Sequence, residues 1–210
     1  MIRILIADDH PIVRKGLREI LTETMDMFDV SEAENGSDVL DRLEREEYDV
    51  LVLDISMPGL SGLDVLKQVK KSRNSIPVLI LSRHPEQQYA VRSIRAGADG
   101  YLTKESAPKE LASAIQKVAR GGKYVSSSMA DQLLDYLKDD PTKRPHEKLS
   151  DREFQVMQMI ASGMTVGEIA QEMSLSVNTI STYRMRVLEK MNLENNAQIM
   201  FYSMHEGLEQ

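Results

Sequence analysis

Short apolar runs alternate with amphipathic stretches along the first 123 residues. The runs lie at residues 2–7, 29–33, 50–53, 78–81 and 100–102, the second and the last being weaker. Unbroken apolar runs are typical of strands in a parallel sheet that is covered on both faces. Between the runs, apolar residues recur at helical spacing. The pattern therefore predicts five strand–helix units and an α/β doubly wound domain with a five-stranded parallel sheet.

The rest of the chain has a different pattern. An amphipathic stretch near 128–138 is followed by residues 139–148, which hold two prolines and no apolar side chain and so predict a solvated linker. Beyond it no strand pattern remains, and the spacing indicates four short helices. They are expected at about 151–162, 166–173, 177–191 and 195–206. We expect three parts: a domain over 1–123, a linker over 124–148 with a helix near 128–138, and a small all-α domain over 149–210.

Composition narrows the class of protein. The net charge of −7 argues against a protein that coats nucleic acid generally, although it leaves room for a local basic face. No cysteine is present, which excludes disulfides and cysteine-based zinc sites, and the four histidines show no paired ligand spacing, so we expect them in turns or on the surface. The longest apolar runs are too short to cross a bilayer, and no signal peptide is apparent. We expect a cytoplasmic protein.

Charged and polar side chains stand where the predicted strands end. Asp8 and Asp9 follow the first strand and Asp54 ends the third, so a sheet with these strands adjacent gathers three carboxylates at one edge. Such a cluster needs a positive partner, and a hard divalent cation such as Mg²⁺ suits oxygen ligands. Ser82 and Lys104 follow the next two strands. A carboxylate, Mg²⁺, a hydroxyl and an ammonium at one point can hold a phosphoryl group.

Asp54 would be the nucleophile, because carboxylates form aspartyl phosphates. Each residue taken alone also has a structural interpretation. The pair Asp8 and Asp9 can cap a helix that begins at Pro11, and Lys104 can be a solvated surface lysine. The joint occurrence at consecutive strand ends favours the phosphoryl site over these separate explanations.

Residues 1–123 resemble the receiver domain of bacterial two-component response regulators, which has a flavodoxin-like fold. The resemblance is carried by a few matching motifs. They are Asp8 and Asp9, DISMPGLSG at 54–62, Ser82, and GYLTK at 100–104. It implies that Asp54 is the phosphoacceptor and that Ser82 and Lys104 contact the phosphoryl oxygens.

The resemblance also implies further roles around Asp54. Asp9, Asp54 and the backbone carbonyl of Ser56 would bind Mg²⁺, with Asp8 assisting through water. Tyr101 stands in the place of the switch aromatic that moves inward when Ser82 is drawn to the phosphate. Pro58, Gly59 and Gly62 would shape the loop after the acceptor, and Ser56 and His84 match positions that tune dephosphorylation.

The predicted helix over 177–191 has two distinct faces on a helical wheel. One face is apolar and must be buried; it holds Ile180, Tyr183, Val187 and Met191. The opposite face and its flanks hold the candidate DNA contacts Asn178, Thr179, Ser181, Thr182, Met185, Arg186 and Lys190. A methionine amid polar residues suits contact with a thymine methyl group, and hydroxyls can bond base edges. The alternative is a solvated face with one stray methionine.

The net charge of the second predicted domain favours binding to DNA as a dimer. From residue 149 onward there are four basic and eight acidic residues, a net charge of −4. Phosphate contacts supply much of DNA affinity, so one copy should bind weakly. Linking two copies raises the effective concentration of the second, which predicts a dimer on DNA.

The stretch LSDREFQVMQMIASGMTVGEIAQEMSLSVNTISTYRMRVLEKMNL, residues 149–193, resembles the LuxR-type helix-turn-helix DNA-binding domain. Joined to a receiver, it is typical of the NarL/FixJ class. That resemblance implies that Glu153, Leu175, Thr179 and Ile180 help define the fold. It also implies that helix 177–191 enters the major groove and that the last helix contributes to dimerisation.

These features predict a transcription regulator. A sensor histidine kinase would phosphorylate Asp54, and the change would control homodimerisation and binding to double-stranded operator DNA with two-fold symmetry. Three alternatives stay open at this point. An aspartyl phosphatase usually has a second acid two residues after its nucleophile, where this chain has Ser56. A regulator with a vestigial pocket and a pure protein-interaction adaptor are the others.

Overall fold

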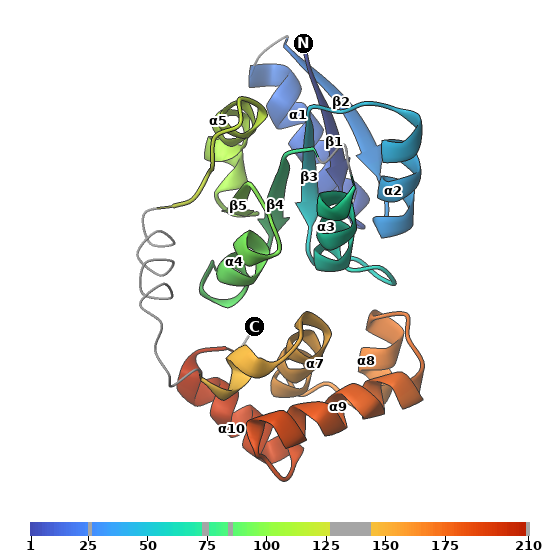
Figure 1. Ribbon diagram of the computed structural model, residues 1–210, viewed down its shortest axis with the longest axis vertical. Coiled ribbons are helices and arrows are strands. Elements are labelled where there is room, and N and C mark those ends of the chain that lie inside the picture. The colour runs from blue at the N-terminus through green and yellow to red at the C-terminus, as the bar shows by residue number, and fades with distance from the viewer. Residues whose placement is uncertain (25–26, 73–75, 84–85, 127–143, 209–210) are drawn as a thin grey trace. The chain divides into compact units, whose positions relative to one another are not determined.

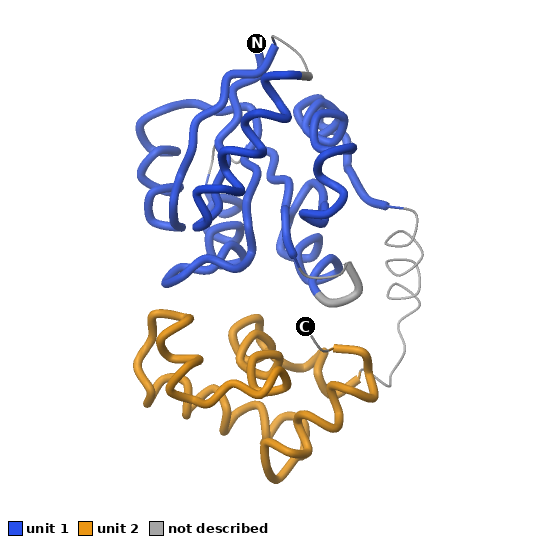
Figure 2. The backbone as a smooth tube through the Cα atoms, turned by 180° about the vertical axis from the view of Figure 1, so that it is seen from behind, with its two compact units in different colours: residues 1–137 blue, residues 138–210 orange. Residues whose placement is uncertain are grey.

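The computed structural model describes residues 1–24, 27–72, 76–83, 86–126 and 144–208. It divides into two compact units, residues 1–137 and 138–210 (Figure 2). The helix expected near 128–138, His84 and most of the expected linker lie outside the described residues.

The first unit is built on a five-stranded parallel sheet with the strand order β2-β1-β3-β4-β5 (Figure 1). Its elements follow one another along the chain as β1 Ile2–Ala7, α1 Pro11–Thr24, β2 Phe28–Ala33, α2 Gly36–Arg45, β3 Val50–Asp54, α3 Gly62–Lys71, β4 Val78–Ser82, α4 Glu86–Arg95, β5 Gly100–Thr103 and α5 Ala107–Ala119. The predicted doubly wound α/β fold is confirmed, and so is the adjacency of β1 and β3.

Burial explains why the strands lack alternation. Every residue of β3 and β4 is buried. Side chains from one face of the sheet pack against the apolar stripes of α1 and α5. The helices α2, α3 and α4 cover the other face (Figure 1). A strand that meets helices on both sides can carry apolar residues at every position.

The second unit is helical. It comprises the 3₁₀ helix η1 Pro145–Lys148 and the helices α7 Asp151–Ala161, α8 Val166–Glu172, α9 Val177–Met191 and α10 Asn196–Glu206. The four predicted helices are confirmed to within one or two residues at each end. Side-chain caps set where they begin, because Ser150, Thr165, Ser176 and Asn195 each accept a backbone N–H of the first turn.

The described ends of the expected linker attach to the two units. The backbone N–H of Tyr124 donates to Asp99, so hydrogen bonding to the sheet edge continues past residue 123. In the second unit, the Nδ1 atom of His146 lies 2.8 Å from the hydroxyl of Tyr202. Arg144 forms an ion pair of 2.9 Å with Glu206 on α10. Residues 144–148 are therefore packed against the helices of the second unit, where the sequence predicted solvated chain.

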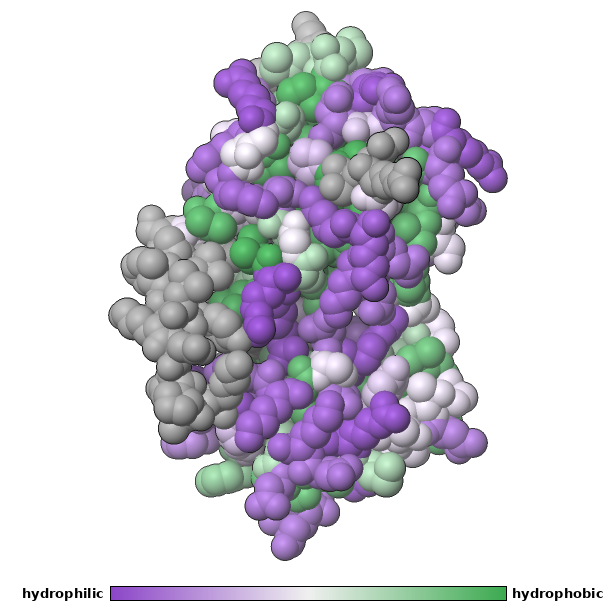
Figure 3. All heavy atoms as spheres, viewed as in Figure 1, coloured by the Kyte–Doolittle hydropathy of each residue, from purple (hydrophilic) through white to green (hydrophobic). Residues whose placement is uncertain are grey.

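The face drawn in Figure 3 is mostly hydrophilic over both units, with hydrophobic residues visible in small groups. Among the described residues, no helix combines the length and the apolar character that crossing a membrane requires.

Candidate functional site

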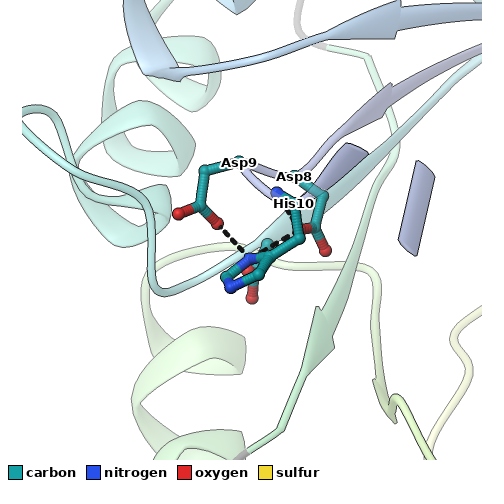
Figure 4. A group of neighbouring side chains, drawn as sticks. Asp8, Asp9 and His10 are labelled. Atoms are coloured by element: carbon teal, nitrogen blue, oxygen red, sulfur yellow. Dashed lines mark hydrogen bonds and ion pairs between the residues drawn. The ribbon is translucent and has the colours of Figure 1, made fainter. Parts of the chain in front are cut away.

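Three carboxylates and one imidazole meet at the carboxyl edge of the sheet. Ligand atoms of Asp8, Asp9, His10 and Asp54 all lie within 4.8 Å of one another. Asp8 and Asp54 are only 1% and 2% exposed, whereas Asp9 is partly buried. Figure 4 shows the ring of His10 turned toward the carboxylates of Asp8 and Asp9. The adjacency of β1 and β3 produces this convergence, as the sequence analysis expected.

Lys104 joins the cluster from the end of β5. Its ammonium nitrogen lies 2.5 Å from Oδ2 of Asp8 and 2.9 Å from Oδ2 of Asp54. The backbone N–H of Lys104 donates to the carbonyl of Ser82 at 2.7 Å, so the end of β4 holds the lysine in place. Lys104 is therefore not a solvated surface lysine, since its side chain is only 12% exposed.

The single ammonium of Lys104 does not balance the charge of the three carboxylates. Burial raises the pKa of Asp54; the ammonium of Lys104 counteracts this and the charge of Asp8 adds to it, so that the pKa stays above its ordinary value. Among the described residues, the buried atom Asp54 Oδ1 has no hydrogen-bond partner. A buried carboxylate oxygen without a donor beside two further acids is the environment in which a divalent cation is stable.

The loop after Asp54 has no room for a side chain at position 62, next to the backbone of the predicted phosphoacceptor. A Cβ atom on Gly62 would lie 1.9 Å from the carbonyl oxygen of Asp54. Gly62 instead donates its N–H to Ile55 at 3.0 Å and begins α3, which Ser61 caps. The backbone N–H of Ser56 bonds the Asp54 carboxylate. The glycine therefore lets the loop fold tightly against the end of β3.

Arg14 holds the end of β1 beside the pocket, a role that the sequence pattern did not indicate. The side chain is 5% exposed and donates to the backbone carbonyl of Asp8 at 2.6 Å. It also bonds Glu32 at 3.1 Å and Glu34 at 3.2 Å. The one available signal was its position three residues before Leu17 on the buried stripe of α1. Arg14 ties the end of β1 to the end of β2.

The predicted switch residues are both inside the protein. Ser82 and Tyr101 are 0% exposed, and they belong to the neighbouring strands β4 and β5. The resemblance implies that the aromatic ring moves inward upon phosphorylation. In this structure, Tyr101 is already buried.

The polar face predicted for α9 is exposed. Asn178, Ser181, Thr182 and Arg186 are exposed, and Met185 is 59% exposed. The buried face predicted from the wheel is confirmed for Ile180, Val187 and Met191, while Tyr183 is partly buried. Exposed side chains of these types could read base edges in the major groove.

Two basic residues of α9 have partners inside the domain. The ammonium of Lys190 lies 2.6 Å from Oε2 of Glu153, whose side chain is 3% exposed. Arg184 donates to Oδ1 of Asn196 at 2.6 Å. In the cap of the same helix, the hydroxyl of Thr179 bonds that of Ser176 at 2.8 Å. Lys190 and Thr179, which were predicted as DNA contacts, therefore each have a partner within the domain.

Burial raises the pKa of Glu153, but hydrogen bonds from Lys190 and Ser150 outweigh it and bring the pKa below its ordinary value. Among the described residues, Arg186 makes no ion pair or hydrogen bond, unlike Lys190 and Arg184. A DNA phosphate could therefore bind Arg186 without breaking a contact within the domain.

Comparisons with known proteins match both units. The family model of the response regulator receiver domain matches residues 4–116, and that of the luxR family of bacterial regulatory proteins matches residues 147–203. The chain is 35% identical to the response regulator UvrY of Escherichia coli K12 over 209 residues, which cover 99% of this chain and 96% of UvrY.

Solved structures of RcsB are also similar, the first of them from Salmonella enterica serovar Typhimurium. One, bound to promoter rprA in the presence of the phosphomimetic BeF₃⁻, has a TM-score of 0.65 and 27% identity, and the match covers 96% of this chain and 98% of RcsB. Another holds two RcsB dimers on two parallel DNAs, with a TM-score of 0.60, 27% identity, and coverage of 96% and 97%.

Proposed function

Because this chain belongs to the response regulators of the NarL/FixJ class, which join a receiver to a LuxR-type DNA-binding domain, we propose that phosphorylation of Asp54 controls its dimerisation and its binding to operator DNA. The donor would be a sensor histidine kinase, the partner that a receiver domain implies. Proteins of this family are transcription regulators, which sets the phosphatase alternative aside. One observation carries the proposal: Asp54 and Lys104 meet in a buried acidic cluster.

The residues present fit a magnesium ion. Asp9, Asp54 and the carbonyl of Ser56 would hold it, with Asp8 assisting, and the unpartnered Oδ1 of Asp54 supports this assignment. When bound, Mg²⁺ supplies positive charge to the oxygens of the incoming phosphoryl group.

The chain's own residues perform the transfer. The Asp54 carboxylate has two oxygens, so one would hold the ion while a lone pair of the other attacks phosphorus and the bond to the donor group breaks. Lys104 then exchanges its contact with the Asp54 carboxylate for one with a phosphoryl oxygen. Ser82, at the end of the adjacent strand β4, would donate its hydroxyl to a second oxygen.

The new contacts supply the switch. A phosphoryl group adds negative charge and acceptor oxygens, which would attract the ammonium of Lys104 and the hydroxyl of Ser82. These residues lie at the ends of β5 and β4 and are joined by a backbone hydrogen bond, so the two strand ends would move together. Because Tyr101 is already buried, the shift would begin with the positions of Ser82 and Lys104, and Tyr101 would follow within the core.

Dimerisation would use the exposed apolar face of α10. Met200, Phe201 and Met204 are 39%, 74% and 66% exposed, and their spacing puts them on one side of the helix. Two copies would bury this face together and bring two α9 helices to a DNA site with two-fold symmetry. The dimeric DNA-bound structures of RcsB support this proposal.

The proposal is tested by measuring DNA affinity with and without a small-molecule phosphodonor. We expect phosphorylation to tighten binding to a selected operator, and Asp54→Asn to abolish both the labelling and the response. Equal affinity in the two states would refute the switch and leave the DNA-binding function intact. Labelling that persists in Asp54→Asn would assign the phosphoacceptor elsewhere.

A further inference from the structure

His10 is the one member of the acidic cluster that the receiver resemblance does not use. Its Nδ1 atom lies 2.7 Å from Oδ1 of Asp9 and 3.3 Å from Oδ1 of Asp8 (Figure 4). The ring is 46% exposed, so the protein does not bury it for packing. At 2.7 Å, Nδ1 donates its hydrogen to the carboxylate of Asp9, and a cation that took the place of this hydrogen would be shared by the nitrogen and the carboxylate oxygens.

The backbone fixes the position of this ring. The N–H of His10 donates to Oδ1 of Asp8 at 2.9 Å. Its carbonyl accepts the N–H groups of Val13 and Arg14 at 3.1 and 3.2 Å, which begins α1. With both backbone groups bonded, the imidazole can reach the cluster without ordering a loop, so little conformational entropy is lost when it binds an ion.

The spacing of the cluster suits octahedral coordination. Ligands at about 2.1 Å from one ion lie roughly 3.0 Å apart when adjacent and roughly 4.2 Å apart when opposite. The four ligand atoms of Asp8, Asp9, His10 and Asp54 lie within 4.8 Å of one another. Small side-chain rotations therefore suffice to place Nδ1 of His10 and the carboxylate oxygens around one ion.

An independent observation points to a ligand at this position. Oδ1 of Asp54 is buried and has no hydrogen-bond partner among the described residues. Lys104 offsets only part of the charge of the three acids. The site therefore attracts a divalent cation, and the nature of its donors decides which one.

We propose that His10 is a metal ligand, and that its imidazole makes the pocket bind a borderline transition-metal ion such as Mn²⁺ or Co²⁺ more tightly than Mg²⁺. Mg²⁺ prefers oxygen donors and keeps its waters, whereas imidazole binds transition ions well. This inference rests on the proposed function in that it concerns the same ion site, and it names the class of ion that the site selects.

The test is calorimetric titration of the full-length protein with Mg²⁺ and with Co²⁺, for the wild type and His10→Asn. Asparagine retains a polar side chain without an imidazole. We expect the change to weaken Co²⁺ binding at least tenfold and to leave Mg²⁺ binding within about threefold. The visible absorption of bound Co²⁺ should shift as the nitrogen ligand is lost.

Two controls make the result decisive. His205→Asn removes an exposed histidine of α10 and should leave both affinities unchanged, which excludes adventitious binding to surface imidazole. Asp54→Asn should weaken both ions, which ties the titration to the pocket. If His10→Asn alters Co²⁺ and Mg²⁺ affinities by the same factor, or leaves the Co²⁺ spectrum unchanged, the proposal is overturned. An equal gain for both ions would show that His10 merely competes with the ion for the carboxylates.

This outcome is separate from that of the proposed function. Labelling of Asp54 by a small phosphodonor in Mg²⁺ should persist in His10→Asn. Absence of labelling in the wild type with any ion would refute the phosphoacceptor role, while the two titrations would still decide whether His10 is a ligand.

Discussion

The substitution Lys190→Met tests whether Lys190 stabilises the fold or contacts DNA. The change removes the ammonium that lies 2.6 Å from Glu153 and retains an unbranched side chain of similar length. Glu153 stays 2% exposed, with the backbone N–H of Ser150 at 2.8 Å as its remaining strong donor. A buried carboxylate then lacks its compensating charge.

The magnitude follows from burial. Removing one partner of a fully buried ion pair costs about 3–5 kcal/mol. The Lys190 side chain is 40% exposed, so water screens the pair, and we expect a loss of about 1–3 kcal/mol. For a small domain this lowers the unfolding midpoint by roughly 5–15 °C. Thermal unfolding of the full chain, followed by circular dichroism, measures it.

The pH dependence gives a second readout. The pKa of folded Glu153 lies below its ordinary value, because its hydrogen bonds outweigh the effect of burial. The ion pair therefore stabilises the wild type above that ordinary value, and this contribution is lost as the pH falls through the folded pKa. Without Lys190, burial favours the protonated acid, so the deficit of Lys190→Met should shrink in acid.

Salt dependence tests the DNA role directly. Each phosphate contact contributes about 0.9 to the slope of log affinity against log salt. We expect Lys190→Met to leave the slope unchanged and Arg186→Met, on the exposed face of the same helix, to reduce it by about 0.9 without loss of stability. The double variant Glu153→Gln with Lys190→Met should recover most of the stability. A stable Lys190→Met with a reduced slope would refute the reasoning and make Lys190 a phosphate contact.

Three further predictions concern the two units. Asp54→Asn should raise the free energy of unfolding in EDTA by about 1–3 kcal/mol, since it removes a buried charge. Because the pKa of folded Asp54 is raised, this gain should shrink as the pH falls, and urea unfolding at two pH values measures it. Gly62→Ala should cost about 2–4 kcal/mol by the same assay, since its methyl group meets the backbone of Asp54, whereas Gly16→Ala, with open space around it, should be neutral or stabilising. Phe201→Ser should reduce dimerisation in analytical ultracentrifugation and leave monomer unfolding unchanged; an undiminished dimer would place the interface elsewhere.

Local sequence determined the elements and the class of the fold. Strands covered on both faces are apolar over most of their length, and the runs at residues 4–7 of β1, 50–53 of β3 and 78–81 of β4 show this without any tertiary information. Cap residues such as Ser150 and Ser176 mark helix starts because a hydroxyl must satisfy the first free N–H groups. The pocket carboxylates were predictable as well, since strand ends of a parallel sheet open on one edge.

Only the tertiary structure decided which charges are paired. Arg14 meets Asp8 across six residues, Lys104 meets Asp54 across 50, and Lys190 meets Glu153 across 37. No local pattern encodes such contacts, because they depend on how whole elements pack. A helical wheel places Lys190 near the polar face but cannot show that a buried acid of another helix lies within its reach. The turn after β1 likewise brings the ring of His10 to the carboxylates, which spacing along the chain could not reveal.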